Sequence, residues 1–325
     1  MPHLRFSLPR SLLSVLLAAT GATASAATGI EALQAACKAD SAPSASLDQV
    51  QVSKVAATPG DLPYYDARSA ATGSSVRLYY ALELDATASS KAACLIGMLD
   101  LLAARLPHMR GAVVWSAIVL TRDGNYIPPK RDGELRWPSV FVGTAWAPDN
   151  MRFLLNVMPH EEAHLSQAMG GASLPRWFAE GHAEWVGLQV TEQIDPALAA
   201  ATRAGRAEAA RRLDSALLGA WGGLRVKSEA IERQLSAADR ARRDSDPNFV
   251  PPGPFSFGPG DFAEDNTDEA GRYGAALALF TGLEQRHGRA AVAAWVRAVL
   301  EEKEAARILP LAARMLGEDL APMLR

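Results

Sequence analysis

Apolar and polar residues begin to alternate in a regular way at about residue 75. Residues 76–82 (Val-Arg-Leu-Tyr-Tyr-Ala-Leu) predict a strand, and Ser90 is placed to cap a helix over residues 91–106. The apolar residues of that helix recur at helical spacing and share one face: Leu95, Met98, Leu99 and Leu102. The pattern therefore predicts a strand followed by a helix that packs on it.

Two further strands are predicted over residues 111–121 and 139–146. Between them lie Arg-Asp-Gly-Asn and Ile-Pro-Pro, which are strong turn signals. After residue 149 the pattern becomes helical, over residues 150–169, 175–191, about 195–244 and 270–324. We therefore expect an α+β fold, in which a small N-terminal sheet backed by a helix precedes a mostly helical C-terminal part.

One segment interrupts the helical part, the Pro/Gly/Phe-rich loop of residues 246–262. Five prolines and three glycines exclude a helix there, and a loop of this length in a compact domain is usually functional. Its four phenylalanines favour packing against something. We expect it to form a flap over a substrate site, just before the helix that contains Tyr273.

The N-terminal residues 1–26 have the pattern of a secretory signal. Arg5 and Arg10 precede a short apolar run, and Ala24-Ser25-Ala26 matches an A-x-A cleavage site. We expect cleavage there and an exported protein, periplasmic or extracellular, with no permanent membrane span. Residues 27–74 show no clear period and are expected to form a loosely structured lead-in, so that the folded domain covers residues 75–325.

The net charge and the cysteines indicate which classes of partner and which cellular compartment to expect. The chain of 325 residues has 33 Lys+Arg against 36 Asp+Glu, a net charge of −3, which excludes a basic surface for nucleic acid. In an oxidising compartment its two cysteines, Cys37 and Cys94, are expected to form a structural disulfide, with two separate buried thiols as the alternative. There is no C-x-x-C motif for redox chemistry.

The residues that indicate chemistry begin at His160-Glu161-Glu162-Ala163-His164, an H-E-x-x-H pattern. Residues four apart on a helix share a face, so His160 and His164 can converge on one Zn²⁺. Glu161 is close enough to reach a metal-bound water without being a ligand. It would take the proton of that water as general base and later deliver it to a leaving amine.

A catalytic zinc site needs a third protein ligand, and the next helix supplies one. Ser173 is a candidate N-cap and Pro175 lies near the first helical position. Glu180 fits the third ligand, and Glu184, four residues on, fits a carboxylate that accepts the free ring N–H of a ligating histidine. His182 is the rival, but two residues along a helix is a rotation of about 200°, so it faces away from Glu180.

H-E-E-A-H followed by L-P-R-W-F-A-E-G-H-A-E-W resembles the gluzincin (peptidase MA-like) zinc metallopeptidases, whose second signature is W-x-x-E-G-x-A-x-aromatic. The resemblance implies a zincin-like fold, with His160, His164 and Glu180 as zinc ligands and Glu161 as the base. It extends to residues 269–280, similar to a later family helix in which Tyr273 would be a donor to the oxyanion of the transition state. A tyrosine of the core is the alternative for Tyr273.

The chain also departs from this family. Pro159 lacks the N–H that would bond to Leu155, so the metal helix must kink there or begin there. The G-x-M-E-N element, which holds the substrate amino terminus in gluzincin aminopeptidases, is missing, and this favours an endopeptidase.

The sequence as a whole predicts a zinc-dependent peptidase acting on peptide or protein substrates. Two alternatives stay open: a zincin-like scaffold that binds metal or protein without cleaving, and a binding module of the cell envelope. The sequence does not define the substrate or the oligomeric state.

Overall fold

A computed structural model describes most of the chain. The residues described are 30–35, 37, 50–57, 62–73, 75–106, 117–121, 136–140, 152–213, 217–246 and 248–324. The expected signal, residues 1–26, lies outside them. By internal contacts the chain divides into two compact units, Met1–Glu162 with Gly187–Ala199, and Ala163–Val186 with Ala200–Arg325.

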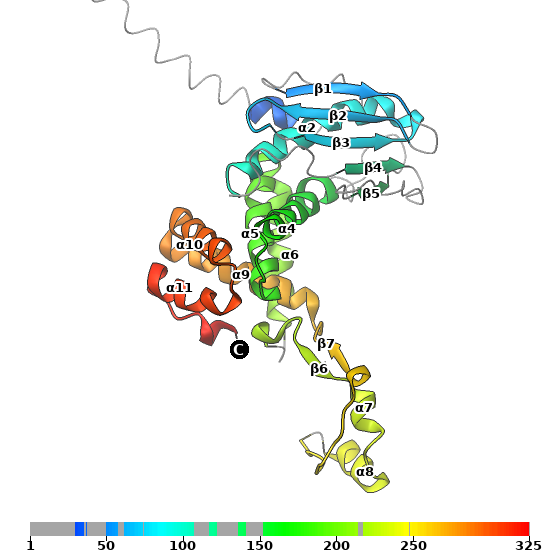
Figure 1. The fold of residues 1–325 in the computed structure, drawn as a ribbon, viewed down its shortest axis with the longest axis vertical. Coiled ribbons are helices and arrows are strands. Elements are labelled where there is room, and N and C mark those ends of the chain that lie inside the picture. The colour runs from blue at the N-terminus through cyan, green and yellow to red at the C-terminus, as the bar shows by residue number, and fades with distance from the viewer. Residues whose placement is uncertain are drawn as a thin grey trace, which may run out of the picture. The chain divides into compact units, whose positions relative to one another are not determined.

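The first unit contains a five-stranded mixed sheet in the order β1-β2-β3-β4-β5. Its elements are β1 (Val50–Val55), β2 (Tyr64–Ser69), β3 (Ser75–Tyr80), η1 (Leu82–Leu84), α2 (Asp85–Ala103), β4 (Ala117–Thr121) and β5 (Arg136–Val140). Strands β1, β2 and β3 are antiparallel neighbours, whereas β3, β4 and β5 pair in parallel. Parallel strands cannot be joined by a tight hairpin, and α2 supplies the crossover between β3 and β4. Figure 1 shows α2 against the sheet.

Helix α2 forms the core of this unit by packing on β2 and β3. It begins at Asp85 rather than after Ser90, so the expected cap at Ser90 is wrong and the helix is longer than predicted. The four apolar residues expected to share its buried face, Leu95, Met98, Leu99 and Leu102, are all at most 1% exposed. Ala92, Ala93 and Ile96 are equally buried, so the helix is covered on more than one side.

The residues before 75 contribute to the sheet, which corrects the expectation of a loosely structured lead-in over 27–74. Strands β1 and β2 both lie in this stretch and pair in register, with Val52 opposite Ala67. Cys94, on α2, forms a disulfide with Cys37, whose Cα lies 4.7 Å away and which is 57 residues distant in sequence. The disulfide expected from the sequence is therefore present, and it ties the helical residues 30–35 and 37 to α2.

The two later strands agree with the sequence where the structure describes them. Residues 117–121 form the end of the strand expected over 111–121. Ser139 and Val140, the first residues of the strand expected over 139–146, belong to β5, which begins earlier, at Arg136, and pairs with β4. Residues 141–146 lie outside the described part of the chain.

The rest of the chain is mainly helical, as the sequence predicted, so the fold is mixed α and β. The elements are η2 (Phe153–Val157), α4 (Met158–Gly170), α5 (Arg176–Ile194), α6 (Pro196–Arg211), η3 (Leu218–Ala220), β6 (Leu224–Val226), α7 (Ser228–Glu232), α8 (Ala237–Ser245), η4 (Pro259–Asp261), β7 (Phe262–Glu264), α9 (Glu269–His287), α10 (Arg289–Glu302), η5 (Ala305–Arg307), α11 (Ile308–Leu316) and η6 (Ala321–Leu324). The helical stretch expected over 195–244 is broken after α6 by the strand β6.

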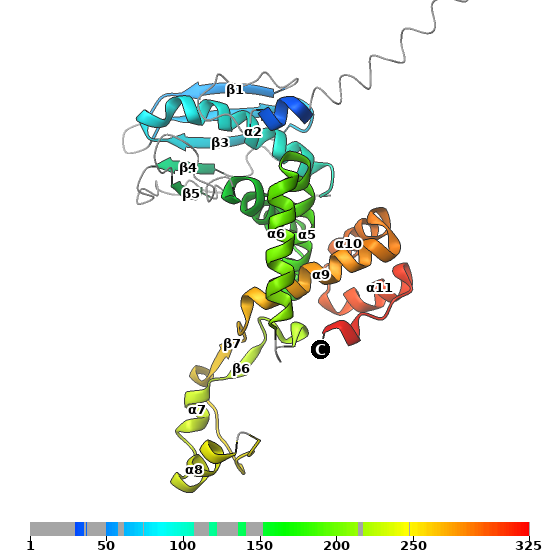
Figure 2. The same ribbon diagram turned by 180° about the vertical axis from the view of Figure 1, so that it is seen from behind.

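The described residues of the Pro/Gly/Phe-rich segment 246–262 form no α-helix, in agreement with its composition, and their one helical turn is the 3-10 turn η4. Its backbone at Ser256 exchanges two hydrogen bonds with the side chain of Gln234, which follows α7. Phe257 packs against Phe255 and Phe262, each at 6.2 Å between ring centroids. The segment thus runs beside α7 and α8 (Figures 1 and 2), and that it forms a flap over the site stays a prediction.

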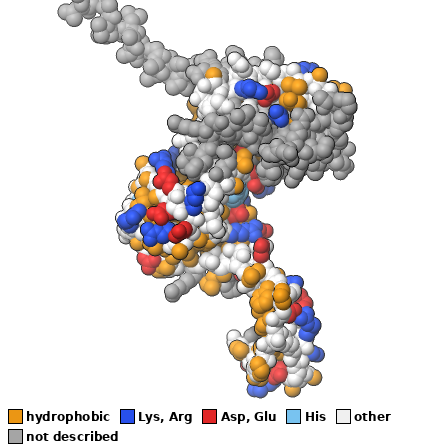
Figure 3. Space-filling model, in the orientation of Figure 1, with side chains coloured by type: hydrophobic (Ala, Val, Ile, Leu, Met, Phe, Trp, Pro, Cys, Tyr) orange, Lys and Arg blue, Asp and Glu red, His pale blue; other side chains and the backbone are white. Residues whose placement is uncertain are grey.

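Hydrophobic side chains gather on the surface over β6 and β7 (Figure 3). Leu224 is 76% exposed and Phe262 is 37% exposed. The two strands form an antiparallel ribbon in which Arg225 lies opposite Ala263.

Candidate metal centre

Helix α4 presents the first two candidate ligands, His160 and His164, one turn apart on one face. Pro159 lies in its first turn and has no N–H to donate to the carbonyl of Leu155. The π-helical turn η2 precedes it, so the metal helix begins at Met158, which is one of the two outcomes expected from Pro159. The hydroxyl of Thr191 donates to the carbonyl of Leu155, the acceptor that Pro159 leaves without its helical donor.

Helix α5 presents the third candidate ligand, Glu180. Gly171 adopts a left-handed conformation, φ +68°, at the turn between the two helices. The carbonyl of Pro175 accepts the first helical hydrogen bonds, from Phe178 and Ala179. The helix therefore starts two residues later than a cap at Ser173 would place it, and Ser173 lies outside it.

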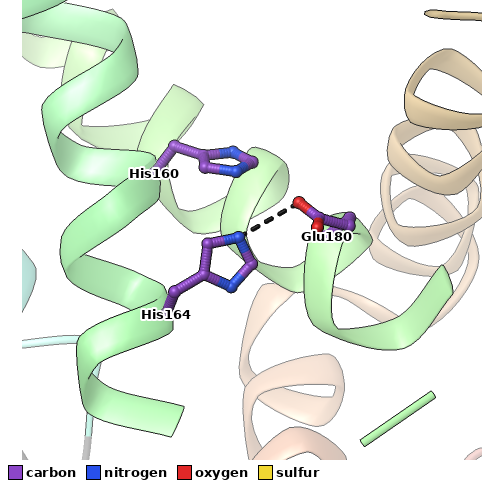
Figure 4. A group of neighbouring side chains, drawn as sticks. All are labelled: His160, His164 and Glu180. Atoms are coloured by element: carbon purple, nitrogen blue, oxygen red, sulfur yellow. Dashed lines mark hydrogen bonds and ion pairs between the residues drawn. The ribbon is translucent and has the colours of Figure 1, made fainter. Parts of the chain in front are cut away.

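The structure brings the three predicted ligands together. One ligand atom from each of His160, His164 and Glu180 lies within 4.8 Å of the other two. In a tetrahedral zinc site, bonds of about 2.0–2.1 Å place neighbouring ligand atoms about 3.3 Å apart. Figure 4 shows both imidazole rings extending from α4 and the carboxylate of Glu180 pointing toward them. The group can hold a metal ion with little rearrangement.

Gln167, which the sequence reading missed, orients His164. Its side-chain nitrogen donates to the carbonyl of Ala179, and its side-chain oxygen lies 3.0 Å from His164 Nδ1. That oxygen can only accept, so Nδ1 donates to it, and Nε2 is the atom through which the ring would bind a metal ion. His164 Nε2 lies 3.0 Å from Glu180 Oε2, which is also an acceptor. Two acceptors this close require a proton or a cation between them.

His182, the rival ligand, is packed among aromatic rings. It is 2% exposed, and its ring centroid lies 6.3 Å from those of both Phe178 and Phe280. Its Nδ1 lies 3.0 Å from the side-chain nitrogen of Gln167. The ligand group named above does not include it.

Glu184 is 5% exposed and accepts hydrogen bonds from Nε and Nη2 of Arg206, an ion pair that the sequence reading missed. The guanidinium of Arg206 also lies over the ring of Tyr273, 4.7 Å from its centroid. That Glu184 accepts from a ligating histidine stays a prediction.

Tyr273 lies beside the third ligand. Burial and then the nearby Glu180 carboxylate raise the pKa of the Tyr273 phenol to about 12, although Arg176 acts in the opposite direction. The ring packs edge-on against Trp221 at 4.9 Å between centroids. The phenol is therefore protonated at neutral pH, and its hydroxyl interacts with Glu180 and Arg176. That it donates to the oxyanion of the transition state stays a prediction.

Close backbone approaches explain two glycines of α5. A β-carbon at Gly181 would lie 2.8 Å from the ring of Phe280 on α9, and one at Gly187 would lie 3.0 Å from the backbone nitrogen of His160. Real β-carbons essentially never come within 3.0 Å of another atom, as one at Gly181 would, and a contact of 3.0 Å, as at Gly187, is tighter than nine in ten real ones. Glycine at each position therefore permits the observed packing.

Two of the missed residues had a signal in the sequence. Gln167 follows His164 by three positions and Arg176 precedes Glu180 by four, and both spacings place side chains on one helical face. Arg206 had none, because it lies on a different helix, 22 residues from its partner Glu184.

Comparison with models of known protein families, with curated proteins and with solved structures finds no match for this chain. Among the helices that the structure describes, none combines the length and apolarity needed to cross a bilayer.

Proposed function

We propose that the protein is a zinc-dependent peptidase with a zincin-like fold. The observation that supports this is the convergence of two imidazoles and one carboxylate from α4 and α5 to within 4.8 Å. Two nitrogen ligands and one oxygen ligand match the donor set of catalytic zinc sites, which leave a fourth position open. The lone pair of His164 and the carboxylate of Glu180, 3.0 Å apart, are the arrangement that a bound cation relieves.

In this proposal His160, His164 and Glu180 hold the ion. When bound, the ion would polarise the scissile carbonyl and lower the pKa of the attacking water. Glu161 directly follows the first ligand on α4 and is half-buried. Its carboxylate accepts the proton of the water and returns it to the nitrogen of the leaving amine. The phenol of Tyr273 donates a hydrogen bond to the negative charge that develops on the carbonyl oxygen.

The substrate class, a peptide or protein, follows from the gluzincin resemblance, and the missing G-x-M-E-N element favours endopeptidase action. Strand β5 ends the order of the described strands, and an extended peptide can add to such an edge by β-pairing. Residues 141 and 142, which belong to the strand expected over 139–146, lie outside the described part of the chain. Export to the periplasm or the extracellular space stays part of the proposal, and the disulfide is compatible with it.

The test is the variant Glu161→Gln, with Glu301→Gln, an exposed glutamate of α10, as the matched control. We expect wild type and both variants to bind one equivalent of Zn²⁺. Cleavage of a fluorogenic peptide library should fall about 10²- to 10⁴-fold in Glu161→Gln, because the general base is lost, and stay unchanged in the control. Unchanged cleavage in Glu161→Gln would contradict the mechanism. A wild-type protein that binds Zn²⁺ tightly but cleaves no peptide would support the scaffold alternative.

A further inference from the structure

Arg176, the first residue of α5, contacts four groups around the candidate metal centre. Its two terminal nitrogens donate to Asn266 Oδ1 and to Glu269 Oε1, each at 2.6 Å. Its Nε lies 3.5 Å from Glu180 Oε1. The face of the guanidinium lies over the ring of Trp221, 5.1 Å from its centroid. A planar fork with five donors can make all these contacts at once, which a lysine cannot.

The contact with Arg176 gives the two carboxylate oxygens of Glu180 different neighbours. Oε1 faces Arg176 at 3.5 Å, whereas Oε2 faces His164 Nε2 at 3.0 Å. With one oxygen held by a guanidinium, the carboxylate offers a single oxygen to an ion beside His164. Arg176 thereby selects a one-oxygen mode of binding for Glu180.

The contacts of Arg176 with Glu269 and Trp221 help to define where Tyr273 lies. Glu269 is the first residue of α9, one helical turn before Tyr273. Trp221 packs edge-on against the Tyr273 ring while its own face receives the guanidinium. The same side chain therefore holds the start of α9 and the ring that borders the tyrosine.

We infer that Arg176 is a positioning residue that fixes Glu180 as a one-oxygen metal ligand and holds Tyr273 beside it. The inference rests on the proposed function, since it names the side chain that joins the third ligand to the candidate oxyanion donor. Second-layer partners of metal ligands commonly change metal affinity about 10- to 100-fold when they are removed.

The experiment compares Arg176→Gln and Arg176→Lys with Arg233→Gln in the full chain. Arg233 is a matched control because it also pairs with a carboxylate at 2.6 Å, that of Asp261, beyond the β6–β7 ribbon. Each protein is titrated with Co²⁺, whose visible absorption reports the number and geometry of its ligands. Zn²⁺ affinity is measured by competition with a chelator, and kcat and KM with a fluorogenic peptide.

We expect Arg176→Gln to bind Co²⁺ and Zn²⁺ about 10- to 100-fold more weakly, with a shifted cobalt spectrum, because Glu180 is then free to bind through both oxygens. Its kcat should fall more than its KM rises. Arg176→Lys should recover most of the metal affinity, since an ammonium can still pair with Glu180, but not kcat, since it lacks the contacts toward α9. Arg233→Gln should match wild type in every measurement.

A further variant, Glu269→Gln, tests the connection to α9 without touching the ligand helix. We expect Glu269→Gln to keep the wild-type cobalt spectrum and to have a lower kcat. This variant also keeps the test decisive if Arg176→Gln fails to fold. Wild-type affinity and spectrum in both Arg176 variants, or unchanged kcat in Arg176→Lys and Glu269→Gln, would overturn the positioning role alone. Failure of the wild-type protein to bind Co²⁺ or Zn²⁺ would overturn the proposed function itself.

Discussion

The hydroxyl of Thr191 on α5 donates a hydrogen bond to the backbone carbonyl of Leu155 in the π-helical turn before the metal helix. That carbonyl is the one that Pro159 leaves without its helical donor. Both groups are buried, Thr191 at 0% exposure, and an unsatisfied buried carbonyl is costly. A side chain 36 residues away thus stabilises the point at which the helix of His160 begins.

Replacing this hydroxyl should destabilise the protein. We expect Thr191→Val, which keeps the shape of the side chain, to lower the free energy of unfolding by about 1–3 kcal/mol, because the Leu155 carbonyl is left buried without its donor. Thr191→Ser keeps the hydroxyl and serves as the control, with a smaller loss. Chemical denaturation of the three proteins makes the comparison, and equal stability of Thr191→Val and wild type would contradict this account of Pro159.

Alanine at Gly187 should disturb the metal centre through the backbone. Its β-carbon would lie 3.0 Å from the nitrogen and 3.2 Å from the Cα of His160, and backbone atoms cannot yield without moving α4. We expect Gly187→Ala to lose about 1–3 kcal/mol of stability and to bind Zn²⁺ at least about tenfold more weakly.

Gly205→Ala on α6 is the matched control, because nothing lies within 4 Å of a β-carbon there. An alanine in place of a helical glycine should add up to about 1 kcal/mol of stability and leave metal affinity unchanged. Thermal denaturation and Zn²⁺ competition measure both effects, and similar behaviour of the two variants would refute the close contact.

Removal of the Gln167 amide should weaken metal binding more than it weakens the fold. In Gln167→Leu the proton on His164 Nδ1 loses its acceptor, 3.0 Å away, so the ring orientation is no longer defined. We expect Zn²⁺ affinity to fall about 10- to 100-fold. Gln234→Leu is the control, since its amide nitrogen likewise donates to backbone carbonyls, those of Ala230 and Ser256, but outside the site. Equal metal affinity in the two variants would argue against an orienting role.

The ion pair of Asp265 and Arg272 should make the stability of the fold depend on pH in the acid range. Arg272 is 1% exposed and donates to the carboxylate of Asp265 at 2.7 Å. Hydrogen bonds from Thr267 and then from Arg272 lower the pKa of Asp265 to about 2. Because this folded-state pKa is depressed, the stabilisation is complete above the unfolded pKa of about 4 and is lost as the pH falls toward 2.

Asp265→Asn should therefore destabilise the protein at pH 7 by about 3 kcal/mol, because a buried guanidinium loses its counter-charge. It should also remove part of the loss of stability between pH 4 and pH 2. Asp244→Asn, at an exposed ion pair with Arg243, should cost less than about 1 kcal/mol. Denaturation curves from pH 7 to pH 2 separate the two, and parallel curves for wild type and Asp265→Asn would count against the pair as the source of the acid dependence.

Local patterns predicted part of the fold. Alternation identified β3, and helical spacing identified the buried residues of α2, because both depend on neighbours in the sequence. Strands β1 and β2 were not predicted, because their apolar residues are few and become buried only when the strands pair. In β1, Val50, Val52 and Val55 are only half-buried.

The sequence by itself determined the identity and spacing of the candidate ligands, since His160 and His164 lie one turn apart on any α-helix and Glu180 lies on the helix that follows. Tertiary structure decided the rest: that Glu180 points at both histidines, that Gln167 fixes the proton of His164, and that Arg176 spans from Glu180 to α9. The physical reason is range. Helical periodicity acts over a few residues, whereas the approach of α5 and α9 depends on glycines, prolines and buried ion pairs whose partners are distant in the sequence.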